Sequence, residues 1–116
     1  MRILAVLAVL ALIVIAGCVD PDPPVLRTLV TVVATLDGRP AEEATARLVA
    51  EGRRALVVVE AALHTADAPG RRRLLRVIKR LVDGGEKDGC PLLGHVATFD
   101  DDVTVRSEAE AARKGC

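Results

Sequence analysis

The chain has 116 residues, and its 16 Lys and Arg residues balance 16 Asp and Glu residues, so the formal net charge is zero. This balance argues against bulk nucleic-acid binding, which needs a basic excess. The sequence has no Trp, Tyr, Asn or Gln, one Phe and a single Ser. Most side chains used for catalysis or for stacking on carbohydrates are therefore missing, and the core must be aliphatic.

The N-terminal segment has the parts of a secretory signal peptide. Arg2 supplies a positive charge, residues 3–15 form an unbroken apolar run, and Ala16 and Gly17 are small residues that a peptidase can accommodate. As a helix, residues 1–17 would reach about 25 Å, and a stable membrane span needs about 20 apolar residues. An uncleaved membrane anchor and a cleaved signal without lipid are the alternatives.

The stretch Ile15-Ala16-Gly17-Cys18 resembles the lipobox of bacterial lipoproteins. The resemblance implies that residues 1–17 are removed as a signal peptide and that Cys18 is lipidated. The protein would then be lipid-anchored in the bacterial cell envelope, at the outer membrane or the extracytoplasmic (periplasmic) face. Two or more acyl chains make such an attachment effectively stable.

Removal of residues 1–17 from the 116 would leave 99 residues, enough for one small domain. Residues 18–24 are the lipidated cysteine and a Pro-rich tether, which we expect to be extended. Residues 25–116 are the expected domain.

Residues 25–36 carry apolar side chains at helical spacing, with Arg and Thr on the opposite side. The apolar positions are Leu26, Leu29, Val30, Val33 and Leu36. Asp37-Gly38 then predicts a turn. Pro40 suits the first turn of a second helix, and Gly52 suits its end.

Residues 53–66 place Leu56, Val59, Ala62 and Leu63 on one helical face, although the run 55–59 would also fit a buried strand. We expect residues 67–70 to break the chain. Residues 71–83 are the clearest amphipathic helix, and Gly84-Gly85 ends it. Its apolar face consists of Leu74, Leu75, Val77, Ile78, Leu81 and Val82.

Residues 90–99 are another short apolar segment. The three aspartates that follow, Asp100 to Asp102, are candidates for a helix N-cap. Residues 103–114 predict a polar helix with Val105, Ala109 and Ala112 facing inward, and Gly115 suits its end.

These segments form three helix–turn–helix units whose second helices begin near Pro40, Gly70 and Val103, about thirty residues apart. Residues 48–56 resemble the junction of HEAT-like repeats, where a glycine and an Ala-Leu pair open the next unit. Asp67 followed by Arg71 or Arg72, and residues 102–106, resemble the inter-helix Asp and basic positions of that family. The first unit lacks the basic residue after its turn.

The resemblance implies an all-α fold, a short HEAT-like array of about three helical hairpins in which stacked neighbours supply the core. It covers residues 25–115. A strand-containing α/β domain, with strands at the valine-rich runs 30–33 and 57–59, is the structural alternative.

With Cys18 assigned to lipid, Cys90 and Cys116 form an even pair in an oxidising compartment. They open and close the last hairpin, and these two ends are neighbours in an antiparallel arrangement. We therefore expect a disulfide. Two unpaired thiols are the alternative, and the absence of a C-x-x-C spacing disfavours a metal site.

No catalytic constellation is readable, so we expect no enzymatic activity, no cofactor and no metal. His64 and His95 have no partner at ligand spacing and are expected to be structural or surface residues. The three aspartates lack the pattern of an EF-hand loop, and Ser107 has no nearby histidine in the sequence.

One charged face is a candidate for binding, and it consists of Arg72, Arg73, Arg76, Lys79 and Arg80. It is either a solvated helix face or the contact for an anionic partner, because the planar guanidinium of arginine suits carboxylate and phosphate. The expected function is a membrane-anchored, non-enzymatic protein-interaction module of the bacterial envelope, with an acidic protein surface as the partner. Binding of anionic lipid headgroups or polymers through the same face is the alternative, and a small hydrolase or lyase is a remote one.

Overall fold

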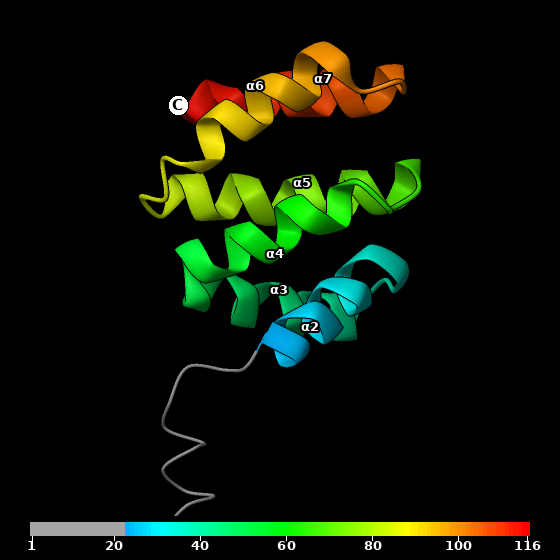
Figure 1. Ribbon diagram of the computed structural model, residues 1–116, viewed down its shortest axis with the longest axis vertical. Coiled ribbons are helices and arrows are strands. Elements are labelled where there is room, and N and C mark those ends of the chain that lie inside the picture. The colour runs from blue at the N-terminus through cyan, green and yellow to red at the C-terminus, as the bar shows by residue number, and fades with distance from the viewer. Residues whose placement is uncertain (1–22) are drawn as a thin grey trace, which may run out of the picture.

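The computed structural model describes residues 23–116, which form six α-helices in three antiparallel pairs (Figure 1). The first helices of the pairs are α2 (Pro23–Thr35), α4 (Arg53–Leu63) and α6 (Gly89–Phe99). The second helices are α3 (Arg39–Glu51), α5 (Ala68–Asp83) and α7 (Val103–Ala112), and the 3₁₀ turn η1 (Arg113–Gly115) follows. These residues contain no strand, so the all-α prediction is confirmed and the α/β alternative is wrong.

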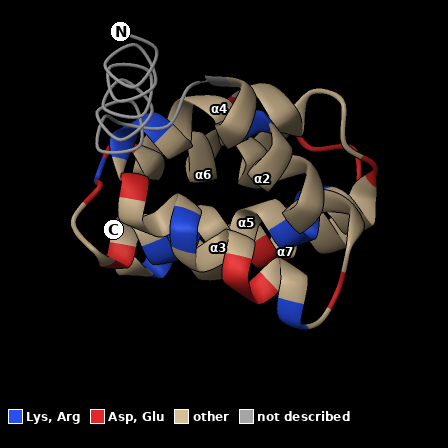
Figure 2. Ribbon diagram, turned by 90° about the horizontal axis from the view of Figure 1, so that it is seen from below, with Lys and Arg blue, Asp and Glu red and all other residues tan. Residues whose placement is uncertain are grey.

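The helices lie in two layers, with the first helices in one layer and the second helices in the other (Figure 2). The turns inside the three pairs lie at one end of the array, and the links between pairs lie at the other (Figure 1). Helix α5 occupies the centre and packs against every other helix of the described part. The core therefore forms around α5.

The core is aliphatic, as the composition predicts, and no polar side chain within residues 23–116 is buried. The six apolar residues predicted for the inward face of α5 are all at most 2% exposed. Val105 and Ala109 of α7 are fully buried, and Ala112 is 5% exposed. Leu36, predicted to join the apolar face of the first helix, is 46% exposed. That prediction is wrong because α2 ends at Thr35 and leaves Leu36 in the turn.

Two helices begin earlier than the sequence predicts. Helix α2 starts at Pro23, so the expected extended segment does not reach residue 24, and α5 starts at Ala68 instead of after a chain break. Both starts have the same cause: a proline is tolerated in the first helical turn, where its missing N–H has no helical partner. The side chain of Asp67 caps α5 by accepting a hydrogen bond from the Gly70 amide at 2.8 Å.

Gly52 alone joins the first two helix pairs. Its φ of 60° lies in the left-handed region, which glycine adopts without the steric cost of a side chain. Its amide donates to the carbonyl of Val49, and its carbonyl accepts from Ala55 at the start of α4. One residue therefore ends α3 and begins α4.

The signal peptide, Cys18 and most of the tether lie outside the described residues. Within residues 23–116, no helix has the length and apolar character needed to cross a membrane.

Candidate functional site

The predicted basic face of α5 is divided between internal ion pairs and exposed charges. Arg72 pairs with Glu108 of α7 at 2.7 Å, and this hydrogen bond raises the pKa of the Arg72 guanidinium. Lys79 pairs with Asp83 on its own helix at 2.8 Å. Arg76 and Arg80 are exposed, and neither forms an ion pair with another residue of the described range 23–116.

Arg73 connects α5 to the first helix pair. Its Nε and Nη2 donate to the two carboxylate oxygens of Asp37, each at 3.0 Å, and its Nη1 donates to the carbonyl of Ala34. Asp37 belongs to the turn between α2 and α3. Arg39, which follows this turn, pairs with Glu43 of α3, and the second unit supplies the basic partner of Asp37.

Arg71 makes the matching connection to the third helix pair. Its Nε and Nη2 donate to the carboxylate of Asp100 at 2.9 and 3.1 Å, and its Nη1 donates to the carbonyl of Ala66. Nη2 also lies 2.9 Å from a carboxylate oxygen of Asp101. Arg71 and Arg73 therefore link the start of α5 to the α6–α7 turn and to the α2–α3 turn. Their role is structural.

The carboxylate of Asp100 is the least exposed charged group in these contacts, with a side-chain exposure of 9%. Burial raises the pKa of Asp100, but hydrogen bonds from the Asp102 amide and from Arg71 outweigh burial and bring the pKa below its ordinary value. The same pairing raises the pKa of Arg71. Asp102 caps α7 by accepting from the Val105 amide at 2.9 Å. Of the three aspartates, Asp100 and Asp101 thus pair with Arg71, and Asp102 caps α7.

A groove of about 510 Å³ lies between α4 and α6, on the layer of first helices. Both histidines of the chain line it, with Phe99, the one Phe, Tyr or Trp residue in the sequence. The rings of His95 and Phe99 lie 4.9 Å apart between centroids. Phe99 is 72% exposed.

The remaining lining of this α4–α6 groove is apolar with an acidic excess. Leu63, Pro91, Leu92 and Val96 contribute apolar surface, and the charged residues are Glu60, Arg71, Asp88 and Asp100. Arg71 and Asp100 pair with each other, whereas Asp88 lies near Arg53 at 3.4 Å with both side chains largely exposed. The groove therefore offers an aromatic ring, an apolar floor and net negative charge.

The sequence gives little signal for this site. His64 and His95 are 31 positions apart, and each alone resembles a surface residue of an amphipathic helix. They share a groove only because consecutive units stack α4 and α6 in the same layer. The only hint of this site in the sequence is that His64, His95 and Phe99 all lie in segments expected to form the first helices of their pairs.

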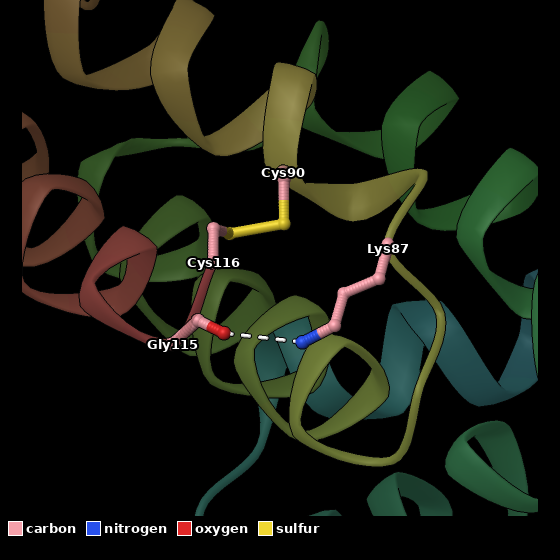
Figure 3. Close-up of a disulfide and its surroundings, with 4 residues drawn as sticks. All are labelled: Lys87, Cys90, Gly115 and Cys116. Atoms are coloured by element: carbon pink, nitrogen blue, oxygen red, sulfur yellow. Dashed lines mark hydrogen bonds between the residues drawn. A yellow bond between two sulfur atoms is a disulfide. The ribbon is translucent and has the colours of Figure 1, made fainter.

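The structure brings Cys90 and Cys116 together in a disulfide, with their Cα atoms 5.9 Å apart (Figure 3). The bond joins the start of α6 to the residue after η1. Lys87, just before α6, donates from Nζ to the carbonyl of Gly115 at 3.1 Å. The bond closes a sequence separation of 26 residues, for which chain entropy predicts a stabilisation of about 3.5 kcal/mol.

Among residues 23–116, no group of three or more His, Cys, Asp or Glu side chains could hold a metal ion. His64 and His95 therefore belong to no such group in the described part of the chain. Ser107 is exposed on α7, which is remote in the sequence from both histidines.

Comparisons of the chain with protein-family models, with curated proteins and with solved structures found no match.

Proposed function

We propose that the protein is a non-enzymatic interaction module, held at the bacterial envelope by a lipid on Cys18, and that its α4–α6 groove binds a segment of a partner protein. The HEAT-like resemblance supports an array that binds through its surface, and the groove supplies a surface with suitable chemistry. The disulfide fits an oxidising, extracytoplasmic compartment.

The exposure of Phe99 carries this proposal. Phe99 is 72% exposed at the edge of an apolar groove. A partner that covers this ring removes apolar surface from water, which makes the free energy of binding more favourable. Aromatic side chains in such positions commonly supply much of the binding energy of an interface. The lining on the α6 side runs from Asp88 to Asp100 and spans the 11 residues of that helix, or about 16 Å, which matches about three turns of a partner helix.

The charge of the groove specifies the partner further. Glu60 and Asp88 lie on opposite walls, and the arginine that lines the groove is already paired with Asp100. A complementary segment would carry Lys or Arg beside an apolar stripe.

A photoactivatable residue at position 95, incorporated in the native bacterial host, tests this function. We expect a covalent adduct with a partner protein, and Phe99→Ala should reduce its yield at least about tenfold, the scale for loss of an interface hot spot. The matched control is Val103→Ala, because Val103 is exposed to a similar degree (67%) outside the groove. An adduct that survives Phe99→Ala, or that both substitutions weaken equally, would contradict the proposal.

The exposed guanidinium groups of Arg76 and Arg80 favour a second candidate surface, the basic face of α5, for an acidic partner. Arg72, Arg73 and Lys79 also belong to this face, but intramolecular carboxylates already neutralise them in part. A second photoactivatable variant at position 76 separates the two surfaces. An adduct from position 76 and none from position 95 would assign the contact to α5.

The envelope anchor is tested by the intact mass of the protein purified from its host. We expect a species that begins at Cys18 with added acyl mass and that lacks two hydrogens because Cys90 and Cys116 are bonded. Globomycin, which blocks the lipoprotein signal peptidase, should prevent the cleavage. An unmodified species that retains residues 1–17 would contradict the anchor.

A further inference from the structure

A second groove of about 620 Å³ lies between α2 and α4, on the same layer as the first but next to the N-terminal end of the described chain (Figure 1). Its lining includes no acidic residue, in contrast to the α4–α6 groove. The apolar lining consists of Leu26, Val30, Val57, Val58, Ala61 and Ala62. Val57 is 64% exposed there, whereas the preceding residue, Leu56, is buried.

The polar lining has charge of one sign. Arg27 and Arg54 carry the only charges in the lining, and they are the fifth residue of α2 and the second residue of α4. Helices α2 and α4 run in the same direction (Figure 1), and the N-terminal end of a helix adds partial positive charge. The other polar residues, Thr31 and Thr65, donate their hydroxyl protons to the backbone carbonyls of Arg27 and Ala62.

The groove therefore combines guanidinium charge with an apolar floor. On the α4 side the lining residues run from Arg54 to Thr65, about 16 Å at about 1.5 Å per residue, and the apolar ones lie between Val57 and Ala62. A ligand that complements it has an anionic head and an apolar tail. The volume lies within the range of about 300–1,000 Å³ that is usual for small-molecule sites.

The position of the groove identifies the source of such a ligand. Cys18 precedes Pro23 by five residues, which span at most about 18 Å. If Cys18 carries a lipid, as the proposed function holds, Arg27 near the start of α2 cannot lie far from the membrane surface. Anionic headgroups near a membrane surface attract arginine by about 1 kcal/mol for each residue.

We propose that the α2–α4 groove binds an anionic phospholipid of the membrane to which the protein is anchored. The phosphate lies beside Arg27, and one acyl chain lies along Val57, Val58 and Ala62. This inference rests on the proposed lipid anchor. It would orient the domain with α2 and α4 toward the membrane and leave the α4–α6 groove beside them for a protein partner.

The test uses the full chain, produced in a bacterial host, purified from membranes and reconstituted into vesicles. The vesicles contain phosphatidylglycerol with a photoactivatable group in the acyl chain. After illumination, tryptic peptides are analysed by mass spectrometry. We expect label on residues 28–47 and 55–71, which contain the two walls of the groove.

Val57→Glu should reduce this labelling at least about tenfold, because an unpaired carboxylate in an apolar groove opposes binding of an acyl chain. Val103→Glu is the matched control, since it introduces the same charge at another exposed valine, and should leave labelling within about twofold, a difference smaller than RT ln 10. Arg27→Glu should also reduce labelling, and it tests the headgroup. Helical circular dichroism verifies that each variant is folded.

Label confined to the tether, or label on the groove peptides that Val57→Glu does not reduce, would overturn the proposal. Equal labelling by photoactivatable phosphatidylcholine would overturn the choice of an anionic headgroup. The intact mass of the same sample shows whether Cys18 is acylated. One preparation therefore shows separately whether Cys18 carries a lipid, from the intact mass, and whether the groove binds phospholipid, from the labelling.

Discussion

Three consecutive arginines at the start of α5 have three different partners. Arg71 binds the turn of the third unit, Arg73 binds the turn of the first unit, and Arg72 pairs with α7. From the sequence, Arg72 and Arg73 belong to a single basic face, and Arg71 is only a position in a repeat motif. The sequence does not distinguish these partners, because each guanidinium extends to a neighbouring helix pair. The position of that pair depends on the packing of the whole domain and not on the residues near the arginine.

We predict that Asp100→Asn destabilises the domain by about 1–3 kcal/mol, because the Arg71 guanidinium, whose side chain is 17% exposed, then keeps only the 91% exposed carboxylate of Asp101 as a charged partner. Guanidinium-induced unfolding, followed by circular dichroism, measures this change. The control is Glu110→Gln, which removes an exposed ion pair with Arg113 and should cost less than about 0.5 kcal/mol. Equal effects of the two substitutions would show that the Arg71–Asp100 pair contributes no more than a surface contact.

The lowered pKa of Asp100 predicts acid sensitivity. A carboxyl whose folded-state pKa is lower than its unfolded value stabilises the fold fully above the ordinary value of 3.8, and loses this contribution as the pH falls through the lowered pKa. The difference in unfolding free energy between the wild type and Asp100→Asn should therefore be constant near pH 6 and shrink between about pH 4 and pH 2. A difference that does not change over this acidic range would contradict the pKa assignment.

At the scale of elements, apolar periodicity predicted six helices within a few residues of their observed bounds. It succeeded because the buried stripe of each helix repeats at helical spacing, most clearly in α5, and because glycines such as Gly52 mark the junctions. It failed at Pro23 and at Pro69, where a proline that signals a break also fits a first helical turn. At Pro69, the helix starts where the side chain of Asp67 caps α5. This contact depends on the backbone geometry of the turn, which the sequence does not show.

The close approach of α6 to α5 gives a prediction for two glycines in one helix. A methyl group on Gly89 would lie 2.7 Å from Cγ2 of Val82 and 3.2 Å from Cγ2 of Ile78, whereas on Gly94 it would meet only the end of Arg113 at 4.0 Å. Gly89→Ala should therefore destabilise the fold by about 1–3 kcal/mol through overpacking. Gly94→Ala should stabilise it by about 0.5–1 kcal/mol through helix propensity. Thermal unfolding of both variants provides the comparison, and a stabilising Gly89→Ala would show that α6 can move away from α5.

At the scale of the whole molecule, the two grooves could not be predicted from the sequence. Each groove lies between first helices of successive pairs, so its size depends on how far apart stacking holds two helices that are not joined directly. The link between α4 and α6 passes through all of α5. The sequence shows which residues are apolar or charged, but the stacking decides that His64 and His95 share a groove and that Arg27 and Arg54 share another.

The central position of α5 leads to a prediction about cooperativity. Leu74 is fully buried on the one helix that packs against all the others of the described range. Leu74→Ala should therefore destabilise the domain by about 2–5 kcal/mol, whereas Leu36→Ala, at a position that is 46% exposed, should cost less than about 1 kcal/mol. Because both end pairs bury their apolar stripes against α5, the loss should appear equally in the slowest-exchanging amides of α2 and α7. Hydrogen exchange measures both. If Leu74→Ala weakened protection in only one end pair, the three pairs would unfold as separate units, and α5 would not be the shared core of the array.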